Sequence, residues 1–185
     1  GGWMDAGDFN KYVTFTAQPI NELLTAYEEK PEIFTDDYNI PESGNGIPDI
    51  IDEIKWELDW LKKMQQSDGG VLLKVGFARS GGGGSHSLPP STNTAYRYYL
   101  PACSSSTIIT ALNFAHAALT FSRFPRLQSY ASDLKDRAIL AWDWYHANPK
   151  NDNLDQGEIE AGDPDMSLQG QAQTATIAAV SLYAL

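Results

Sequence analysis

The sequence is poor in the residues that build covalent or metal-centred sites. Cys103 is the one cysteine among 185 residues, which excludes an internal disulfide and a cysteine-based metal cluster; we expect it to be a small buried side chain. The histidines His86, His116 and His146 show no H-x-x-x-H spacing, so the sequence does not indicate a zinc site. No serine stands in a G-x-S-x-G setting, which argues against a serine nucleophile.

Positive charge and long apolar runs are also scarce. The chain has 13 basic and 24 acidic residues, a net charge of −11. Because phosphate groups are bound by Lys and Arg, we expect no nucleic-acid partner and no anionic lipid surface. There is no apolar run of 18 residues, so no membrane-spanning helix is expected. A neutral polymer such as a glucan meets no electrostatic penalty at this surface.

The chain does have the material for one sizeable core. Hydrophobic residues make up 42% of it, with five Trp, nine Tyr and seven Phe, which fits one domain or part of one. Apolar spacing predicts helices over about 12–29, 48–64, 104–122, 127–147 and 169–185. Pro19 should bend the first helix or delay its regular part. One short strand is predicted at Val71–Val75, so the chain reads as mainly helical.

Four polar or glycine-rich segments are predicted to be loops. They cover residues 1–12, 31–46, 78–94 and 148–167. The third contains four consecutive glycines, and a loop of that length in a compact domain is more often functional than accidental. We therefore expect function to lie in the loops rather than in the helices.

The opening run carries the strongest chemical signal. It reads Gly1-Gly2-Trp3-Met4-Asp5-Ala6-Gly7-Asp8-Phe9-Asn10-Lys11-Tyr12. Two carboxylates held close together have separated pKa values, so one can stay ionised as a base while the other positions or shares a proton. The structural alternatives are that Asp8 caps the helix that follows and that Asp5 stabilises the glycine turn.

This run resembles the N-terminal signature of glycoside hydrolase family 9, the cellulase family with an (α/α)6 barrel. A second stretch, from Gly44 to Glu53 and on through Trp60-Leu61 and Gln65, resembles the helix that follows in that family. Tyr99-Leu100-Pro101 and Gly162-Asp163 fit the same order more loosely. The resemblance implies an all-α fold, here an incomplete portion of an (α/α)6 barrel. Residues 1–185 would form a partial catalytic domain, truncated at both ends.

Carried over by position, the resemblance implies that Asp8 is the catalytic base and that Asp5 helps to hold the attacking water. The implied reaction is hydrolysis of β-1,4-glucosidic bonds in cellulose or a related β-glucan, with inversion, by an endoglucanase. The family's general-acid Glu motif and its histidine and arginine substrate motif are not found. Glu158 and Glu160 are interpreted as solvated loop acids, so we expect the acid outside this chain.

Two alternatives stay open at this point. An exo-acting glucosidase, glucosaminidase or cellobiohydrolase can use the same scaffold. A non-catalytic glucan-binding fragment is the other alternative, because the acid motif is missing.

Sugar contacts are expected from aromatic residues near the glycine-rich loops. Trp3 flanks the two aspartates, and Tyr96, Tyr98 and Tyr99 follow the four-glycine loop. Aromatic faces pack against pyranose rings, although core packing is the plainer interpretation of the tyrosines. His86 lies next to the same glycines and could reach a cleft, so it is a further candidate for substrate binding.

The resemblance also bears on metals, location and association. Some family members bind calcium through a Ser-Asp-Glu run, but this chain has Ser167-Leu168-Gln169, so no cofactor is expected. Family 9 membership implies a secreted, periplasmic or extracellular protein. An incomplete barrel would expose apolar helix faces, which predicts self-association.

Overall fold

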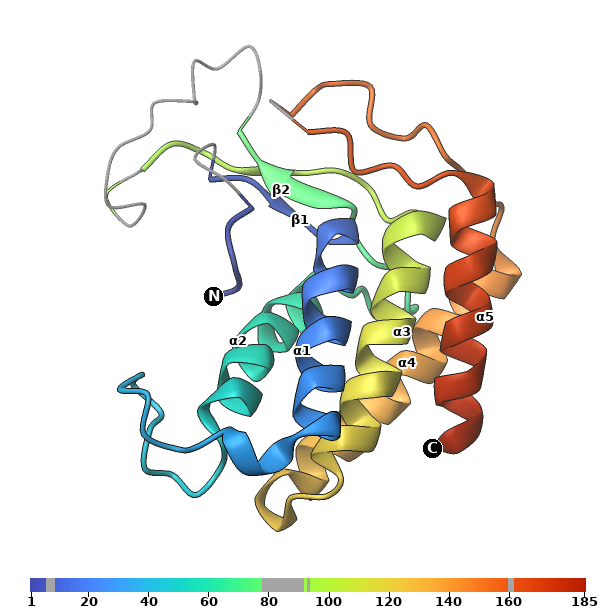
Figure 1. Cartoon of the computed structure of the whole chain (residues 1–185). Coiled ribbons are helices and arrows are strands. Elements are labelled where there is room, and N and C mark those ends of the chain that lie inside the picture. Colours follow the sequence, from blue (N-terminus) through green and yellow to red (C-terminus); the bar gives the residue numbers. More distant parts are fainter. Residues whose placement is uncertain (6–8, 78–91, 93, 160–161) are drawn as a thin grey trace.

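The computed structural model describes residues 1–5, 9–77, 92, 94–159 and 162–185. Five α-helices dominate this described part of the chain: α1 (Ala17–Glu29), α2 (Asp49–Met64), α3 (Ser104–Phe121), α4 (Gln128–Ala147) and α5 (Leu168–Ala184). Short 3₁₀ turns are η1 (Thr14–Thr16), η2 (Pro31–Ile33) and η5 (Pro125–Leu127). The helices lie roughly alongside one another below a small sheet and a set of loops (Figure 1). The prediction of a mainly helical chain is confirmed.

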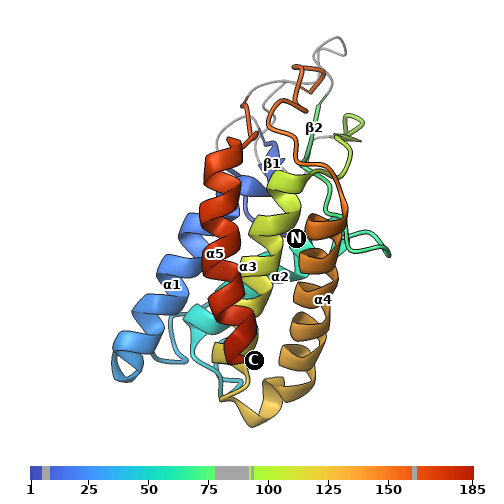
Figure 2. The same cartoon turned by 90° about the vertical axis from the view of Figure 1, so that its right-hand side faces the viewer.

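Helix α3 is the centre of the assembly. It packs against α1, α4 and α5, with α1 and α5 on either side of it (Figures 1 and 2). All but two of its residues are buried, as expected for a helix that is surrounded by protein. Among its buried polar residues, Asn113 accepts from Asn21 Nδ2 at 2.8 Å and donates to Thr16 Oγ1 at 2.9 Å. These bonds tie α3 to α1 just below the sheet.

Helix α2 buries the apolar stripe that its sequence predicts. Ile51, Ile54, Leu58 and Leu61 have no exposed surface, whereas Trp56 is 50% exposed. Asp49 lies in the first turn, and Lys62 and Lys63 lie in the last, so the charges complement the helix dipole. The predicted amphipathic helix is therefore confirmed.

The first helix starts later than its predicted position at Tyr12. Lys11–Tyr12 is instead strand β1, and the amide of Val13 donates to the Leu73 carbonyl at 3.1 Å. Because these backbone groups bond to a neighbouring strand, they cannot form helical bonds. Pro19 is the third residue of α1, in the first turn, where a missing N–H costs little. It delays the regular helix and does not interrupt it.

Within the described ranges, three short strands form an antiparallel sheet in the order β1-β2-β3. Strand β2 (Lys74–Gly76) is central, and its Val75 faces Lys11 on one side and Tyr99, from β3 (Tyr98–Tyr99), on the other. The single strand predicted at 71–75 was therefore placed too early, and two partners were missed. Strands of two or three residues are too short to show an alternating pattern.

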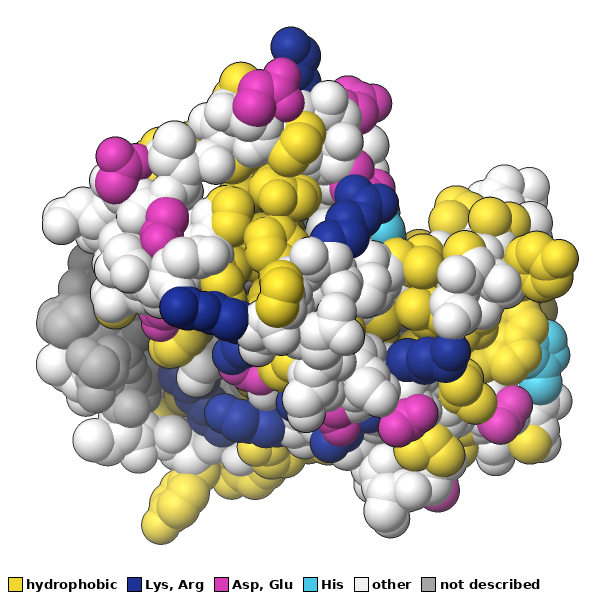
Figure 3. All heavy atoms as spheres, turned by 90° about the horizontal axis from the view of Figure 1, so that it is seen from below, with side chains coloured by type: hydrophobic (Ala, Val, Ile, Leu, Met, Phe, Trp, Pro, Cys, Tyr) yellow, Lys and Arg dark blue, Asp and Glu magenta, His cyan; other side chains and the backbone are white. Residues whose placement is uncertain are grey.

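Helix α5 has no charged residue although much of it is exposed. One side packs on α3 through Ala178, while Ile177, Val180 and Tyr183 are 56%, 67% and 95% exposed. Seen from below, hydrophobic side chains gather on the right-hand side, where α4 and α5 lie (Figure 3). This exposed side of α5 is called the α5 apolar face below.

Cys103 precedes α3 and is buried, as predicted. Its Sγ lies 3.4 Å from Ser106 Oγ. Burial raises the pKa of its thiol, although hydrogen bonds from Ser106 and Ser105 oppose the shift. The residue is therefore a neutral packing group.

None of the helices in the described ranges combines the length and the apolar character needed to cross a membrane.

Candidate active site

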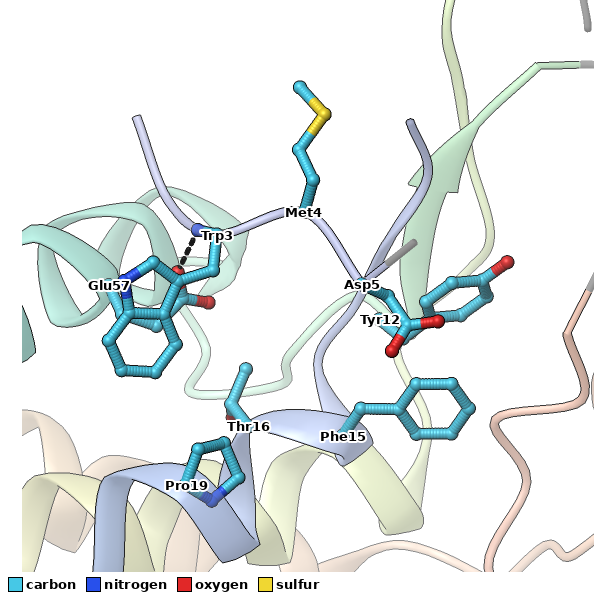
Figure 4. Close-up of a pocket in the computed structure, with 8 residues that line it drawn as sticks. All are labelled: Trp3, Met4, Asp5, Tyr12, Phe15, Thr16, Pro19 and Glu57. Carbon is cyan, nitrogen blue, oxygen red and sulfur yellow. Dashed lines mark hydrogen bonds between the residues drawn. The ribbon is translucent and has the colours of Figure 1, made fainter. Parts of the chain in front are cut away.

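A pocket of about 220 Å³ opens beside the N-terminal segment. It lies between that segment, η1, the start of α1 and the middle of α2 (Figure 4). The lining residues are Trp3, Met4, Asp5, Tyr12, Phe15, Thr16, Pro19 and Glu57. An open hollow that combines carboxylates with aromatic rings is a reasonable place for a polar ring-shaped ligand.

Asp5 and Glu57 occupy different sides of this pocket. Asp5 lies beside Tyr12 and Phe15, and Glu57 lies behind Trp3 (Figure 4). The rings of Tyr12 and Phe15 are 4.6 Å apart. Asp5 is exposed, so its carboxylate can hold or orient a water molecule without a desolvation penalty. Asp8, the predicted base, lies outside the described residues.

The segment that leads to Asp5 is held by hydrogen bonds at several atoms. The Trp3 amide donates to Glu57 Oε2, and the Trp3 indole Nε1 donates to Glu53 Oε1 at 2.5 Å. Lys11 Nζ donates to the carbonyls of Gly1 and Gly2, the latter at 2.7 Å. An otherwise irregular segment is thereby fixed to α2 and β1.

Glu57 was not anticipated as a site residue. It is only 1% exposed. Burial raises its pKa to about 7. The hydrogen bond from Trp3 and the positive charge of Lys11 lower the pKa, but their effect is smaller than that of burial. The sequence did contain a signal, because Glu57 lies three residues after Ile54 and four before Leu61, on the buried face of α2. A glutamate at such a position needs a partner.

The chain that leaves residues 6–8 is fixed by the sheet. Asn10 is 1% exposed, and its Oδ1 accepts from the Phe77 amide at 3.2 Å. A Cβ added at Gly76 would lie 2.1 Å from the same Asn10 oxygen. Strand β2 can therefore lie this close to Asn10 only because residue 76 has no side chain. Both flanks of the stretch that carries Asp8 are therefore anchored.

The loop of residues 148–167 is anchored to the same sheet by a buried ion pair. Lys74 on β2 pairs with Asp155, and their side chains are 0% and 2% exposed. Lys74 Nζ also donates to the Gly162 carbonyl at 3.0 Å and lies 5.5 Å from the centre of the Tyr12 ring. The loop is thus fixed beside a ring that lines the pocket.

The predicted tyrosine cluster is on the surface. Tyr96, Tyr98 and Tyr99 are 86%, 52% and 60% exposed, so the interpretation as core packing was wrong. Exposed rings remain available for stacking on a sugar. Glu158 is exposed, as expected of a solvated loop acid. Two further residues of the prediction, His86 and Glu160, lie outside the described residues.

The start of α5 lacks the Ser-Asp-Glu run that was considered above as a calcium site. Leu168 and Gln169 bring no carboxylate to it, and Ser167 Oγ accepts from the Gly170 amide at 3.2 Å. Asp165 Oδ2 accepts from the Asp155 amide at 2.7 Å. Among the described residues there is no group of three or more His, Cys, Asp or Glu side chains that could hold a metal ion.

Comparisons with known proteins agree with this arrangement. The sequence profile of Glycosyl hydrolase family 9 matches residues 1–185. Endoglucanase D of Acetivibrio thermocellus is 32% identical over 165 residues, which cover 88% of this chain and 25% of that protein. A cellulose 1,4-beta-cellobiosidase of the same species is 31% identical over 157 residues, covering 77% of this chain and 17% of that protein.

A solved structure extends the match to three dimensions. The crystal structure of a metagenome-derived glycoside hydrolase family 9 endoglucanase has a TM-score of 0.86 at 35% identity, over 99% of this chain and 32% of that one. This mostly helical chain therefore matches (α/α)6 barrel structures of the family over about one third of their chains, and the predicted incomplete barrel is confirmed. This chain belongs to glycosyl hydrolase family 9 and forms part of a catalytic domain of that family.

Proposed function

We propose that this chain carries the base half of a glycosidase site that hydrolyses β-1,4-glucosidic bonds in cellulose or a related β-glucan. The main support is a pocket in which Asp5 is open to solvent and Trp3 is fixed, in a chain of family 9. The chain spans about a quarter or less of the curated relatives described above. We therefore also propose, rather than infer from these relatives, that a longer enzyme containing this chain has this activity.

In the proposed reaction, Asp8 accepts a proton from a water molecule that attacks the anomeric carbon. Asp5 accepts a hydrogen bond from the same water and orients it. A general acid on the other side of the sugar protonates the leaving oxygen, and an inverting enzyme separates the two carboxyl groups by roughly 6.5–9.5 Å. The sequence has no match to the family's acid motif, so residues 1–185 supply one side of the pair.

The proposed substrate is an uncharged glucan, which agrees with the net charge of −11. Trp3 lines the pocket, and the exposed rings of Tyr96 and Tyr98 offer flat apolar surfaces for pyranose rings. We also propose that His86, which lies beside the four glycines in the sequence, binds the same sugars. An enzyme acting on such a polymer would work outside the cytoplasm, and we propose a secreted or periplasmic location.

A second candidate is exo action on the same scaffold. One relative is named a cellulose 1,4-beta-cellobiosidase, so family membership at about 30% identity does not select endo cleavage. Product profiles from a longer enzyme that contains this chain separate the two candidates. Endo cleavage lowers the viscosity of soluble cellulose derivatives quickly, whereas exo cleavage releases short products with little change in viscosity.

Two measurements test the proposal. Calorimetric titration of the isolated chain with cellotetraose should show binding, which Trp3→Ala should weaken. In a longer enzyme that contains this chain, Asp8→Asn should remove most of the activity and leave the melting temperature unchanged. Near-normal turnover by Asp8→Asn would contradict the role of the base, and binding without any cleavage by the longer enzyme would favour a glucan-binding protein.

A further inference from the structure

Trp3 is bound at two points to one face of a single helix. Glu53 and Glu57 are four residues apart in α2, so their side chains lie one above the other on the same side of the helix. Glu57 accepts from the backbone amide of Trp3, and Glu53 accepts from its indole. The backbone and the ring of Trp3 are therefore both placed by α2.

The backbone before Trp3 also lies directly against α2. Gly2 has a φ of +80°, and a Cβ at this position would lie 2.6 Å from Trp60 Cβ and 3.0 Å from Glu57 Oε2. Lys11 Nζ donates to the carbonyls of Gly1 and Gly2 and lies 5.7 Å from the centre of the Trp60 ring. This approach leaves no room for a side chain between the segment and the helix.

The geometry points to Glu57 as a positioning residue that fixes Asp5 at the rim of the pocket by binding the Trp3 amide. This inference rests on the proposed function, because it is the proposed reaction that requires Asp5 to be fixed. Only Met4 separates Trp3 from Asp5, a span of at most about 7 Å of chain. A displacement of the Trp3 backbone is therefore passed on to Asp5.

The charge of Glu57 should change the strength of this bond near neutral pH. Burial raises the pKa of Glu57 to about 7; the Trp3 hydrogen bond, Lys11 and the amino group of Gly1 lower it, and Glu53 raises it. A carboxylate accepts a shorter and stronger hydrogen bond than a neutral acid. The bond to Trp3 should therefore strengthen as pH rises through 7.

Nuclear magnetic resonance of the ¹⁵N-labelled 185-residue chain tests this directly. In the unsubstituted protein, the Trp3 amide proton should move downfield between pH 6 and pH 8 (a window of about one unit either side of the Glu57 pKa). Glu57→Gln keeps an acceptor but cannot ionise, so the Trp3 amide shift should become flat while the amide stays protected from hydrogen exchange. Glu57→Ala removes the acceptor, and Trp3 amide exchange should accelerate at least about tenfold.

Glu53→Gln is the matched control on the same helix. It changes the acceptor of the indole, so the indole N–H resonance should shift while the Trp3 amide still titrates. A Trp3 amide that does not titrate in the unsubstituted chain, or one that still titrates in Glu57→Gln, would overturn the inference. If Glu57→Ala does not fold, this comparison between Glu57→Gln and Glu53→Gln decides the question.

Ligand binding separates this inference from the proposed function. Cellotetraose affinity should fall about tenfold in Glu57→Ala and stay within about threefold in Glu57→Gln at pH 6. If the unsubstituted chain binds no cello-oligosaccharide, the proposed function loses its support, while the Trp3 amide titration still measures the contact with Glu57. If Trp3 behaves as expected but Glu57→Ala binds sugar normally, Glu57 is a structural residue without influence on the pocket.

Discussion

Lys74 and Asp155 form an ion pair in which both side chains are almost completely buried, at 0% and 2% exposure. Lys74 belongs to the middle strand of the sheet, and Asp155 belongs to the loop of residues 148–167. Removal of one partner leaves the other charge buried without compensation, which typically costs about 3–5 kcal/mol. The pair therefore adds little net free energy of folding by itself, but it requires the loop to stay in the position that brings Asp155 to Lys74.

We expect Asp155→Asn to lower the free energy of unfolding by about 3 kcal/mol, measured by urea denaturation at pH 7. Glu32→Gln is the control, because it removes a carboxylate from the exposed pair of Lys30 and Glu32 at 3.4 Å. Exposed pairs contribute about 0–1 kcal/mol, so this variant should unfold close to the unsubstituted protein. Equal effects of the two substitutions would show that the buried pair has no special role.

A second prediction concerns the dependence of stability on pH. Glu57 titrates near 4.5 when unfolded and near 7 when folded, so the unfolded chain gives up its proton first as pH rises. A carboxyl with a raised folded pKa contributes stability that is fully present below pH 4.5 and is lost as pH passes 7. Between these limits the unsubstituted protein should lose on the order of 2–3 kcal/mol relative to Glu57→Gln.

Denaturant unfolding of both proteins at several pH values between 4.5 and 8 measures this difference. Glu29→Gln removes an exposed carboxyl from α1 and serves as the control, with a pH profile parallel to that of the unsubstituted protein. Parallel profiles for Glu57→Gln as well would mean that the pKa of Glu57 is the same in the folded and the unfolded protein.

A third prediction concerns the tyrosines of β3. If Tyr98 stacks on a sugar, Tyr98→Ala should weaken cellohexaose binding about tenfold, because loss of an aromatic anchor costs more than about 1 kcal/mol. The melting temperature should change little, since the ring is 52% exposed. Tyr38→Ala is the matched control: its ring is 55% exposed and lies away from the sheet, between η2 and α2. Equal affinities for both variants would argue against the stacking role.

A fourth prediction is that the chain self-associates with a second copy through the α5 apolar face. This face is uncharged although the whole chain carries a net charge of −11, so it is a place where two copies can meet without direct charge repulsion. Val180→Lys should shift the population toward monomer in light scattering and sedimentation. Thr25→Lys, which adds the same charge on α1, should not. A monomeric unsubstituted chain would contradict the prediction.

The helices could be predicted because each is long and has a clear apolar pattern. The starts of α2, α3, α4 and α5 lie within two residues of the expected positions. The sheet could not be predicted in the same way. Lys11 was expected in the opening loop and Tyr12 at the start of the first helix. Their strand structure comes from pairing with Lys74 and Val75, more than 60 residues away. Such long-range pairing overrides local preference.

The part of the site that is local in the sequence could be predicted, and the part that depends on long-range packing could not. The aspartates are visible because they lie close together in the sequence, and the family motif gives them roles. Glu57 becomes a neighbour of Trp3 only when α2 packs against the N-terminal segment, because the two residues are 54 positions apart in the sequence. Its position on an apolar helix face was a signal, but a buried glutamate alone does not reveal what it binds.

The solitary thiol of Cys103 gives this molecule a built-in reporter of opening. Because the sulfur is enclosed at the beginning of the central helix and its proton is retained, an alkylating reagent reaches it only when Cys103 separates from Leu73, Leu100 and Ile159, against which it packs. The rate of modification therefore times this separation without an added label. Slower modification on addition of a cello-oligosaccharide would then show that sugar binding and the closure of this cluster are coupled.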